Sequence, residues 1–220
     1  MNVYHFTYSH PGYNIGDIPS VVDFFFASDD LLFATDHFKE YSCGIECDNL
    51  WVYKHTMDPK TAKDAAHFAY YNYNDPDEAD SLMVAVLQKC PSIANTDLLI
   101  EASVYRNPNT LKMILNLLSN KTLPIRALLQ AVYYNNEENS RILVESGRIK
   151  DLNGQVLAYT CEMGRRNLFD TVLPISNVDA AMRIASTENF QWLEEAFAMQ
   201  QQNRLHQTID IPTASRARKI

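Results

Sequence analysis

The chain has 220 residues with an ordinary globular composition, 46% hydrophobic and 21% charged, which suits one large domain or two small ones. Its net charge of −8 argues against a nucleic-acid backbone as the main partner, because phosphates repel an acidic surface. There is no apolar run long enough to span a membrane and no secretory-signal pattern at the start of the sequence. With four scattered cysteines, this composition favours a reducing, cytoplasmic setting.

The first 60 residues are predicted to form a small α/β head with the element order strand, strand, helix, strand (ββαβ). The expected strands cover residues 3–8, 21–27 and 49–54, which are rich in β-branched and aromatic residues. Turn-forming residues at 11–17 predict a loop. Ser28-Asp29-Asp30 can cap a helix that runs from Leu31 to Phe38, and Pro59 suits the first turn of the next helix. A unit of this size is marginal alone, so we expect it to dock on the helices that follow.

Residues 61–200 predict a mainly α fold built from repeated helical hairpins. Each copy has an apolar helix centred on a small residue, a polar break and a second apolar helix. The clearest copy runs from Ala127 to Gly147, with Ala131 as the small residue and Gly147 just past the second helix, where positive φ is favoured. Equivalent positions recur every 24–30 residues at Leu87, Leu115, Leu143, Leu173 and Phe197. Such a period is typical of a stacked helical array, although an irregular helical domain with similar hairpins remains an alternative.

This pattern resembles ankyrin repeats. Residues 136–147 look like the second half of an ankyrin unit, as do residues 164–173 after a first helix at 158–162, and Thr96-Asp97-Leu98-Leu99 echoes the start of a unit. The resemblance covers about residues 65–200 and implies a protein-binding scaffold without chemistry of its own.

Tyrosines follow the small residue of the first helix in three copies, and the next copy carries a methionine and two arginines there. The candidate partner-binding residues are Tyr70, Tyr71, Tyr105, Tyr133, Tyr134, Met163, Arg165 and Arg166. In a stack they would align as a ridge, and tyrosine and arginine often dominate interface energetics. The alternative is that part of this set packs between repeats.

The head is also similar to ADP-ribosyltransferase-like domains, through Tyr4-His5-Phe6-Thr7 and Phe25-Phe26-Ala27-Ser28. This similarity implies that His5 would grip the ribose of NAD and Phe25 would stack on the nicotinamide. The alternative is that His5 is a strand histidine with a local hydrogen bond and Phe25 belongs to the core.

Metal-ligand chemistry is present at His37, Cys43, Cys47 and His55, but no second cysteine pair accompanies it and the histidine spacing is arbitrary. We therefore expect no metal and no cofactor. Residues 201–220 carry four basic residues and one acidic, which leaves about −11 on the remainder, and we expect them to form a flexible basic tail.

The layout of an α/β head followed by divergent repeats resembles ankyrin proteins of large DNA viruses and phages. We expect a non-catalytic, intracellular scaffold that binds another protein, such as a viral or phage factor that sequesters or inhibits a host protein. The two alternatives are a reduced ADP-ribosyltransferase-like enzyme that uses NAD and a structural subunit of a larger assembly.

Overall fold

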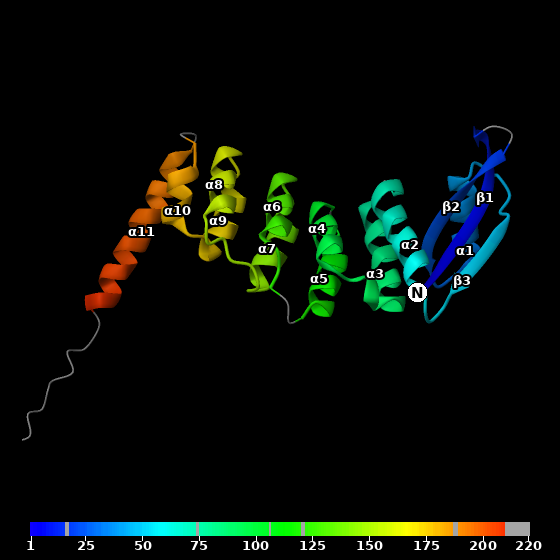
Figure 1. Ribbon diagram of the computed structural model, residues 1–220, viewed down its shortest axis with the longest axis horizontal. Helices are drawn as coiled ribbons and strands as arrows, with labels where there is room; N and C mark the ends of the chain where they lie inside the picture. Colours follow the sequence, from blue (N-terminus) through cyan, green and yellow to red (C-terminus); the bar gives the residue numbers. More distant parts are fainter. Residues whose placement is uncertain (16–17, 74, 106, 120–121, 187–188, 210–220) are drawn as a thin grey trace, which may run out of the picture. The chain divides into compact units, whose positions relative to one another are not determined.

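The computed structural model describes residues 1–15, 18–73, 75–105, 107–119, 122–186 and 189–209 (Figure 1). The chain is mainly helical, with a small antiparallel sheet near its N-terminus. It divides into two compact units, Met1–Arg148 and Ile149–Ile220, which are treated separately below. The predicted boundary at residue 60 is not where these units meet, because the head packs against the helices that follow it.

The head contains a three-stranded sheet in which the first strand is central. Strand β1 (Asn2–Ile15) pairs with β2 (Ile18–Ser28) on one side and with β3 (Asn49–Tyr53) on the other. Helix α1 (Leu31–Tyr41) follows β2, which confirms the predicted ββαβ order. The loop predicted at 11–17 is wrong for residues 11–15, because β1 continues through a register shift between His10 and Asn14. Such irregularities accommodate proline and glycine within a strand. Residues 16 and 17 lie outside the described residues.

One face of the sheet packs against α1. Of the three candidate capping residues at 28–30, Asp30 caps the helix by accepting a hydrogen bond from the amide of Leu32 at 2.7 Å. Phe38 of α1 is 2% exposed, and its ring stacks on Phe6 of β1 with the centroids 4.7 Å apart. Phe24 of β2 joins the same cluster, so the head has its own aromatic core.

In the described part of the first unit, six helices follow the head and form three hairpins. Their bounds are α2 (Pro59–Asn72), α3 (Pro76–Lys89), α4 (Thr96–Val104), α5 (Pro108–Leu117), α6 (Ile125–Tyr133) and α7 (Glu137–Glu145), with a short 3-10 helix η1 (Pro91–Ile93) after α3. Within the hairpins, α2 packs on α3, α4 on α5 and α6 on α7, while α3, α5 and α7 contact one another in series and α4 contacts α6. Ala102 and Ala131 are fully buried, as expected for small residues that let α4 and α6 approach closely.

Polar side chains cap helix ends across successive hairpins. The buried carboxylate of Asp80 in α3 accepts hydrogen bonds from the amide and hydroxyl of Thr110 at the start of α5, at 2.7 and 2.5 Å. Nδ2 of Asn139 in α7 donates to the carbonyls of Ala102 and Tyr105 at the end of α4, at 3.0 and 2.7 Å. These bonds satisfy backbone groups that a helix end leaves unpaired, and they fix each hairpin to the next.

The head is joined to the first hairpin by apolar and polar contacts. Phe68 of α2 packs edge-on against Phe24 and Phe25 of β2. The hydroxyl of Tyr73 donates to the carbonyl of Phe25 at 2.8 Å, and Nζ of Lys89 donates to the carbonyl of Lys54 at 2.9 Å. The head therefore docks on α2 and α3, as expected from its small size.

The second unit contains α8 (Gln155–Glu162), α9 (Arg166–Val172), a 3-10 helix η2 (Leu173–Ile175), α10 (Val178–Ile184) and α11 (Phe190–Ile209). Helix α8 packs on both α9 and α10, and α10 packs on α11. The flexible tail expected from residue 201 is wrong for residues 201–209, because α11 continues through them. Glutamine, arginine and leucine are good helix formers, so a helix that begins on packed residues propagates through this segment. Residues 210–220 of the predicted tail lie outside the described residues.

Candidate protein-binding surface

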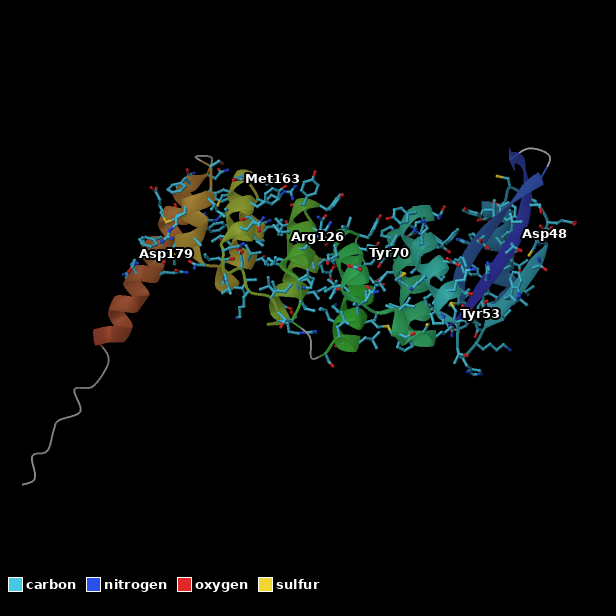
Figure 2. The ribbon with its side chains drawn as sticks, in the orientation of Figure 1. Asp48, Tyr53, Tyr70, Arg126, Met163 and Asp179 are labelled. Atoms are coloured by element: carbon cyan, nitrogen blue, oxygen red, sulfur yellow. The ribbon has the colours of Figure 1, made fainter. Side chains whose placement is uncertain are left out.

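The five candidate tyrosines lie at the C-terminal ends of α2, α4 and α6. We call Tyr70, Tyr71, Tyr105, Tyr133 and Tyr134 the tyrosine strip (Figure 2 labels Tyr70). Tyr105 stacks on Tyr70 with ring centroids 4.8 Å apart and meets Tyr71 edge-on at 6.3 Å. Tyr133 and Tyr134 meet edge-on at 5.0 Å. The fold thus brings tyrosines from neighbouring hairpins to the same ends of their helices, and rings from the first two of these hairpins are in contact.

Burial divides the tyrosine strip into a support and a surface. Tyr70 is only 5% exposed, and burial raises the pKa of its hydroxyl well above the usual value. Tyr71, Tyr133 and Tyr134 are 59%, 55% and 54% exposed. Tyr105 lies between these extremes, and burial followed by its contact with Tyr71 raises its pKa. Tyr70 therefore supports the ring of Tyr105, whereas Tyr71, Tyr133 and Tyr134 each expose more than half of their surface.

The backbone under the tyrosine strip is held by asparagines of α7 and its N-cap. The carbonyl of Tyr105 accepts from Nδ2 of Asn136 at 2.9 Å, in addition to its bond with Asn139. Asn135 adopts a left-handed conformation with φ of +56°, and the amide of Asn136 returns to the carbonyl of Ala131 at 2.8 Å. This is the turn geometry that ends a helix within one residue, so α6 stops directly after its two tyrosines.

A hollow of about 390 Å³ adjoins the tyrosine strip between α2 and α4. Its lining mixes apolar residues with charged and polar ones, which are Lys63, Asp64 and His67 on the α2 side and Asp97 and Glu101 on the α4 side. The ring of His67 packs on Tyr71 with centroids 4.4 Å apart, which connects the hollow to the strip. A partner that covers the exposed tyrosines could thus also place a polar side chain in this hollow.

The remaining predicted binding residues, Met163, Arg165 and Arg166, belong to the second unit. Met163 ends α8 and is 42% exposed, and Arg165 is the residue before α9. The guanidinium of Arg166 lies 5.2 Å from the ring centroids of both Phe169 and Trp192. It also pairs with Asp170 at 3.3 Å and Glu195 at 3.5 Å. Arg166 is therefore held by contacts within its own unit.

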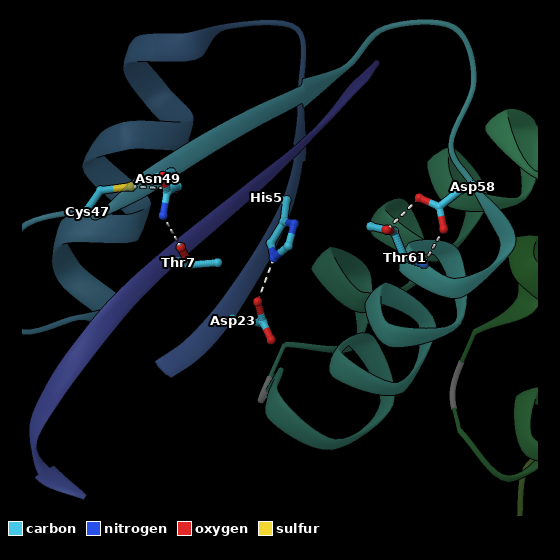
Figure 3. A network of polar contacts seen from close by, with 7 residues as sticks. All are labelled: His5, Thr7, Asp23, Cys47, Asn49, Asp58 and Thr61. Atoms are coloured by element: carbon cyan, nitrogen blue, oxygen red, sulfur yellow. Dashed lines mark hydrogen bonds and ion pairs between the residues drawn. The ribbon is translucent and has the colours of Figure 1, made fainter. Parts of the chain in front are cut away.

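His5 and Phe25, the two residues of the enzyme alternative, are adjacent, but their rings pack against each other. His5 and Phe25 are paired across β1 and β2, and their rings stack with centroids 4.2 Å apart. The other face of the His5 ring meets Trp51 at 4.9 Å, and Nε2 of His5 lies 2.6 Å from the carboxylate of Asp23 (Figure 3). Phe25 is 1% exposed and is also covered by Phe68. In this arrangement the ring of Phe25 offers no open face on which a nicotinamide could stack.

Two of the residues with metal-ligand chemistry, His37 and Cys47, have other partners. Nε2 of His37 lies 3.1 Å from a carboxylate oxygen of Glu78, and Sγ of Cys47 lies 2.8 Å from the carbonyl of Asn49 (Figure 3). Among the described residues, no three histidine, cysteine, aspartate or glutamate side chains are grouped closely enough to hold a metal ion. Cys43, Cys47, Cys90 and Cys161 are free thiols, and burial raises the pKa of Cys161 to about 11.

The supports of the tyrosine strip were missed by sequence reasoning. In the sequence, Asn136 and Asn139 look like polar residues at a helix start. Their hydrogen bonds to the end of α4 depend on which helix packs opposite them.

No family model, curated protein or solved structure matches the chain. Within the ranges that the structure describes, no helix combines the length and apolar character needed to cross a membrane.

Proposed function

We propose that the chain is a non-catalytic scaffold that binds another protein through the tyrosine strip, with its helical hairpins stacked in an ankyrin-like array. The observation that carries this proposal is the placement of three tyrosines, each more than half exposed, at helix ends of the first and third hairpins. Between them lies Tyr105 at the end of α4, where asparagine side chains hold its carbonyl by two hydrogen bonds. In the described part of the chain the strongest contacts between hairpins join neighbours in series, an arrangement typical of proteins that offer an extended binding surface.

The physical advantage of this surface is that its aromatic groups are ordered before a partner arrives. A tyrosine supplies a large contact area with only two side-chain torsions to fix, so little conformational entropy is lost on binding. Stacking of Tyr105 on Tyr70 and of His67 against Tyr71 already restricts these side chains. A partner with an apolar surface and a polar side chain for the adjoining hollow fits this arrangement.

The enzyme alternative has less support, since Phe25 is covered by His5 and Phe68. Binding of NAD in the head would require these rings to separate, and a rise in melting temperature with NAD would be the sign of it. A structural subunit would use the same surface in a permanent assembly. We place the protein in a reducing, intracellular compartment, a proposal supported by its four free thiols.

Site-specific photo-crosslinking tests the proposal. A benzophenone amino acid replaces Tyr133 in one sample and Leu32, a 75% exposed residue of α1, in a control. After irradiation in a lysate of cells that express the chain, we expect a discrete protein adduct from position 133 that is absent from position 32. Equal adducts from both positions, or adducts from position 32 alone, would show that the tyrosine strip is not the binding surface.

A further inference from the structure

The head has one sheet edge without the usual protection. Strand β3 pairs only with β1 among the described residues, and its five residues contain no charge, no proline and no bulge. Leu50, Trp51 and Val52 are 40%, 42% and 39% exposed (Figure 1 shows β3 in the head). Natural proteins blunt such edges with lysine, proline or a covering element, because an open edge pairs with other strands.

The opposite edge of the same sheet shows the contrast. Strand β2 contacts α2 and α3, and its carbonyl at Phe25 accepts a hydrogen bond from Tyr73. The fold therefore covers one edge of the sheet and leaves the apolar one open.

We propose that a second copy of this chain covers β3 by antiparallel pairing of the two β3 strands across a two-fold axis at Trp51. The sequence around β3 is self-complementary in this register. Each Leu50 lies opposite Val52 of the second copy, and each Asp48 lies opposite Lys54 of the second copy. The result is a continuous six-stranded sheet with an apolar centre and an ion pair at each end.

Charge decides the direction of pairing. Asp48 and Lys54 immediately flank β3 on its two sides, and both are exposed. A parallel, in-register pairing would set Asp48 against Asp48 and Lys54 against Lys54, whereas the antiparallel pairing sets opposite charges together twice. Like charges directly opposite each other destabilise a strand pair, and opposite charges stabilise it.

Aromatic packing also favours a two-fold axis at Trp51. The rings of Phe25, His5 and Trp51 form a row across one face of the sheet, with successive centroids 4.2 and 4.9 Å apart. A residue on a two-fold axis lies opposite itself, with Cβ atoms about 5 Å apart. The two Trp51 side chains would therefore meet, and each row of three rings would continue into the row of the second copy. The dimer would carry two tyrosine strips, which allows bivalent binding of a repeated partner.

The test uses the full chain in sedimentation velocity from about 1 to about 500 µM, the range suited to a small interface. We expect a reversible monomer–dimer equilibrium and, at high concentration only, slower amide hydrogen exchange in residues 49–53. Lys54→Asp should raise the dimer dissociation constant about tenfold, because both ion pairs become repulsive. Asp48→Lys combined with Lys54→Asp should restore dimerisation, and this rescue excludes a simple folding defect.

A chain that stays monomeric throughout this range would overturn the proposal. So would a dimer whose dissociation constant is unchanged by Lys54→Asp, since its interface would then lie elsewhere. Concentration-independent protection of residues 49–53, produced only by adding an extended peptide of another protein, would also overturn it by assigning the edge to a different occupant.

Discussion

Gly154→Ala should destabilise the second compact unit strongly. Gly154 precedes α8 with a left-handed φ of +68°, and a Cβ atom there would lie 2.2 Å from the amide nitrogen of Ala181 in α10 and 2.7 Å from the carbonyl oxygen of Asn177. Both neighbours are backbone atoms, so α10 must move. The left-handed conformation costs a non-glycine residue about 1–2 kcal/mol. Overpacking adds about 1–3 kcal/mol, which gives a total of about 2–5 kcal/mol.

Gly164→Ala provides the matched control in the same unit. Its φ is +64°, but the nearest atom to its added Cβ is the amide nitrogen of the Asn189 side chain at 3.7 Å, an ordinary contact. Only the conformational cost of about 1–2 kcal/mol should appear there. Urea unfolding followed by the fluorescence of Trp192, in a Trp51→Phe background, reports on the second unit. If both glycine variants lose the same stability, the reasoning about close approach of α8 and α10 is refuted.

Three further predictions concern the first unit. Asp80→Asn should lower the free energy of unfolding, measured in urea, by about 2–3 kcal/mol, because the buried carboxylate accepts charge-assisted hydrogen bonds from the start of α5. An effect as small as that of Asp77→Asn, at an exposed position of the same helix, would contradict this. Ala131→Leu should cost about 1–3 kcal/mol through overpacking at a fully buried site, and an unchanged melting temperature would show that α4 and α6 do not meet there. The hydrogen bonds from Thr61 lower the pKa of Asp58 below 3.8, so its capping of α2 is complete above that pH and is lost as the pH falls through the lowered pKa. Asp58→Asn should therefore abolish this part of the acid dependence, measured as melting temperature from about pH 6 to about pH 3.

Local signals in the sequence predicted the elements of the fold well. Asp30 caps α1, Pro59 opens α2 under the capping side chain of Asp58, and Gly147 follows α7 with φ of +66°. Each of these features depends on a few neighbouring residues, so the sequence determines it directly. The loop predicted at 11–15 and the tail predicted at 201–209 were wrong. In both segments a strand or helix continues through residues that are typical of turns or flexible tails.

The contacts of the candidate site depend on long-range packing and could not be predicted. Asn139 bonds to a carbonyl 34 residues earlier in the chain, and only the stacking of α4 against α6 and α7 brings the two together. The burial of Tyr70 and the exposure of Tyr71 also follow from which side of α2 faces α4, although both read as equivalent in the sequence. The stacking of His5 on Phe25 is set by the register of β1 against β2.

The central claim is that a partner protein binds at the tyrosine strip. Its most direct test is the dissociation constant of the protein captured at position 133, measured by isothermal titration calorimetry with Tyr134→Ala and with Leu32→Ala as the matched control. Tyr134→Ala should weaken binding by about 2 kcal/mol, or about 30-fold, with an unchanged circular dichroism spectrum, while Leu32→Ala binds like the wild type. Unchanged affinity for Tyr134→Ala, or an equal loss for Leu32→Ala, would contradict the claim.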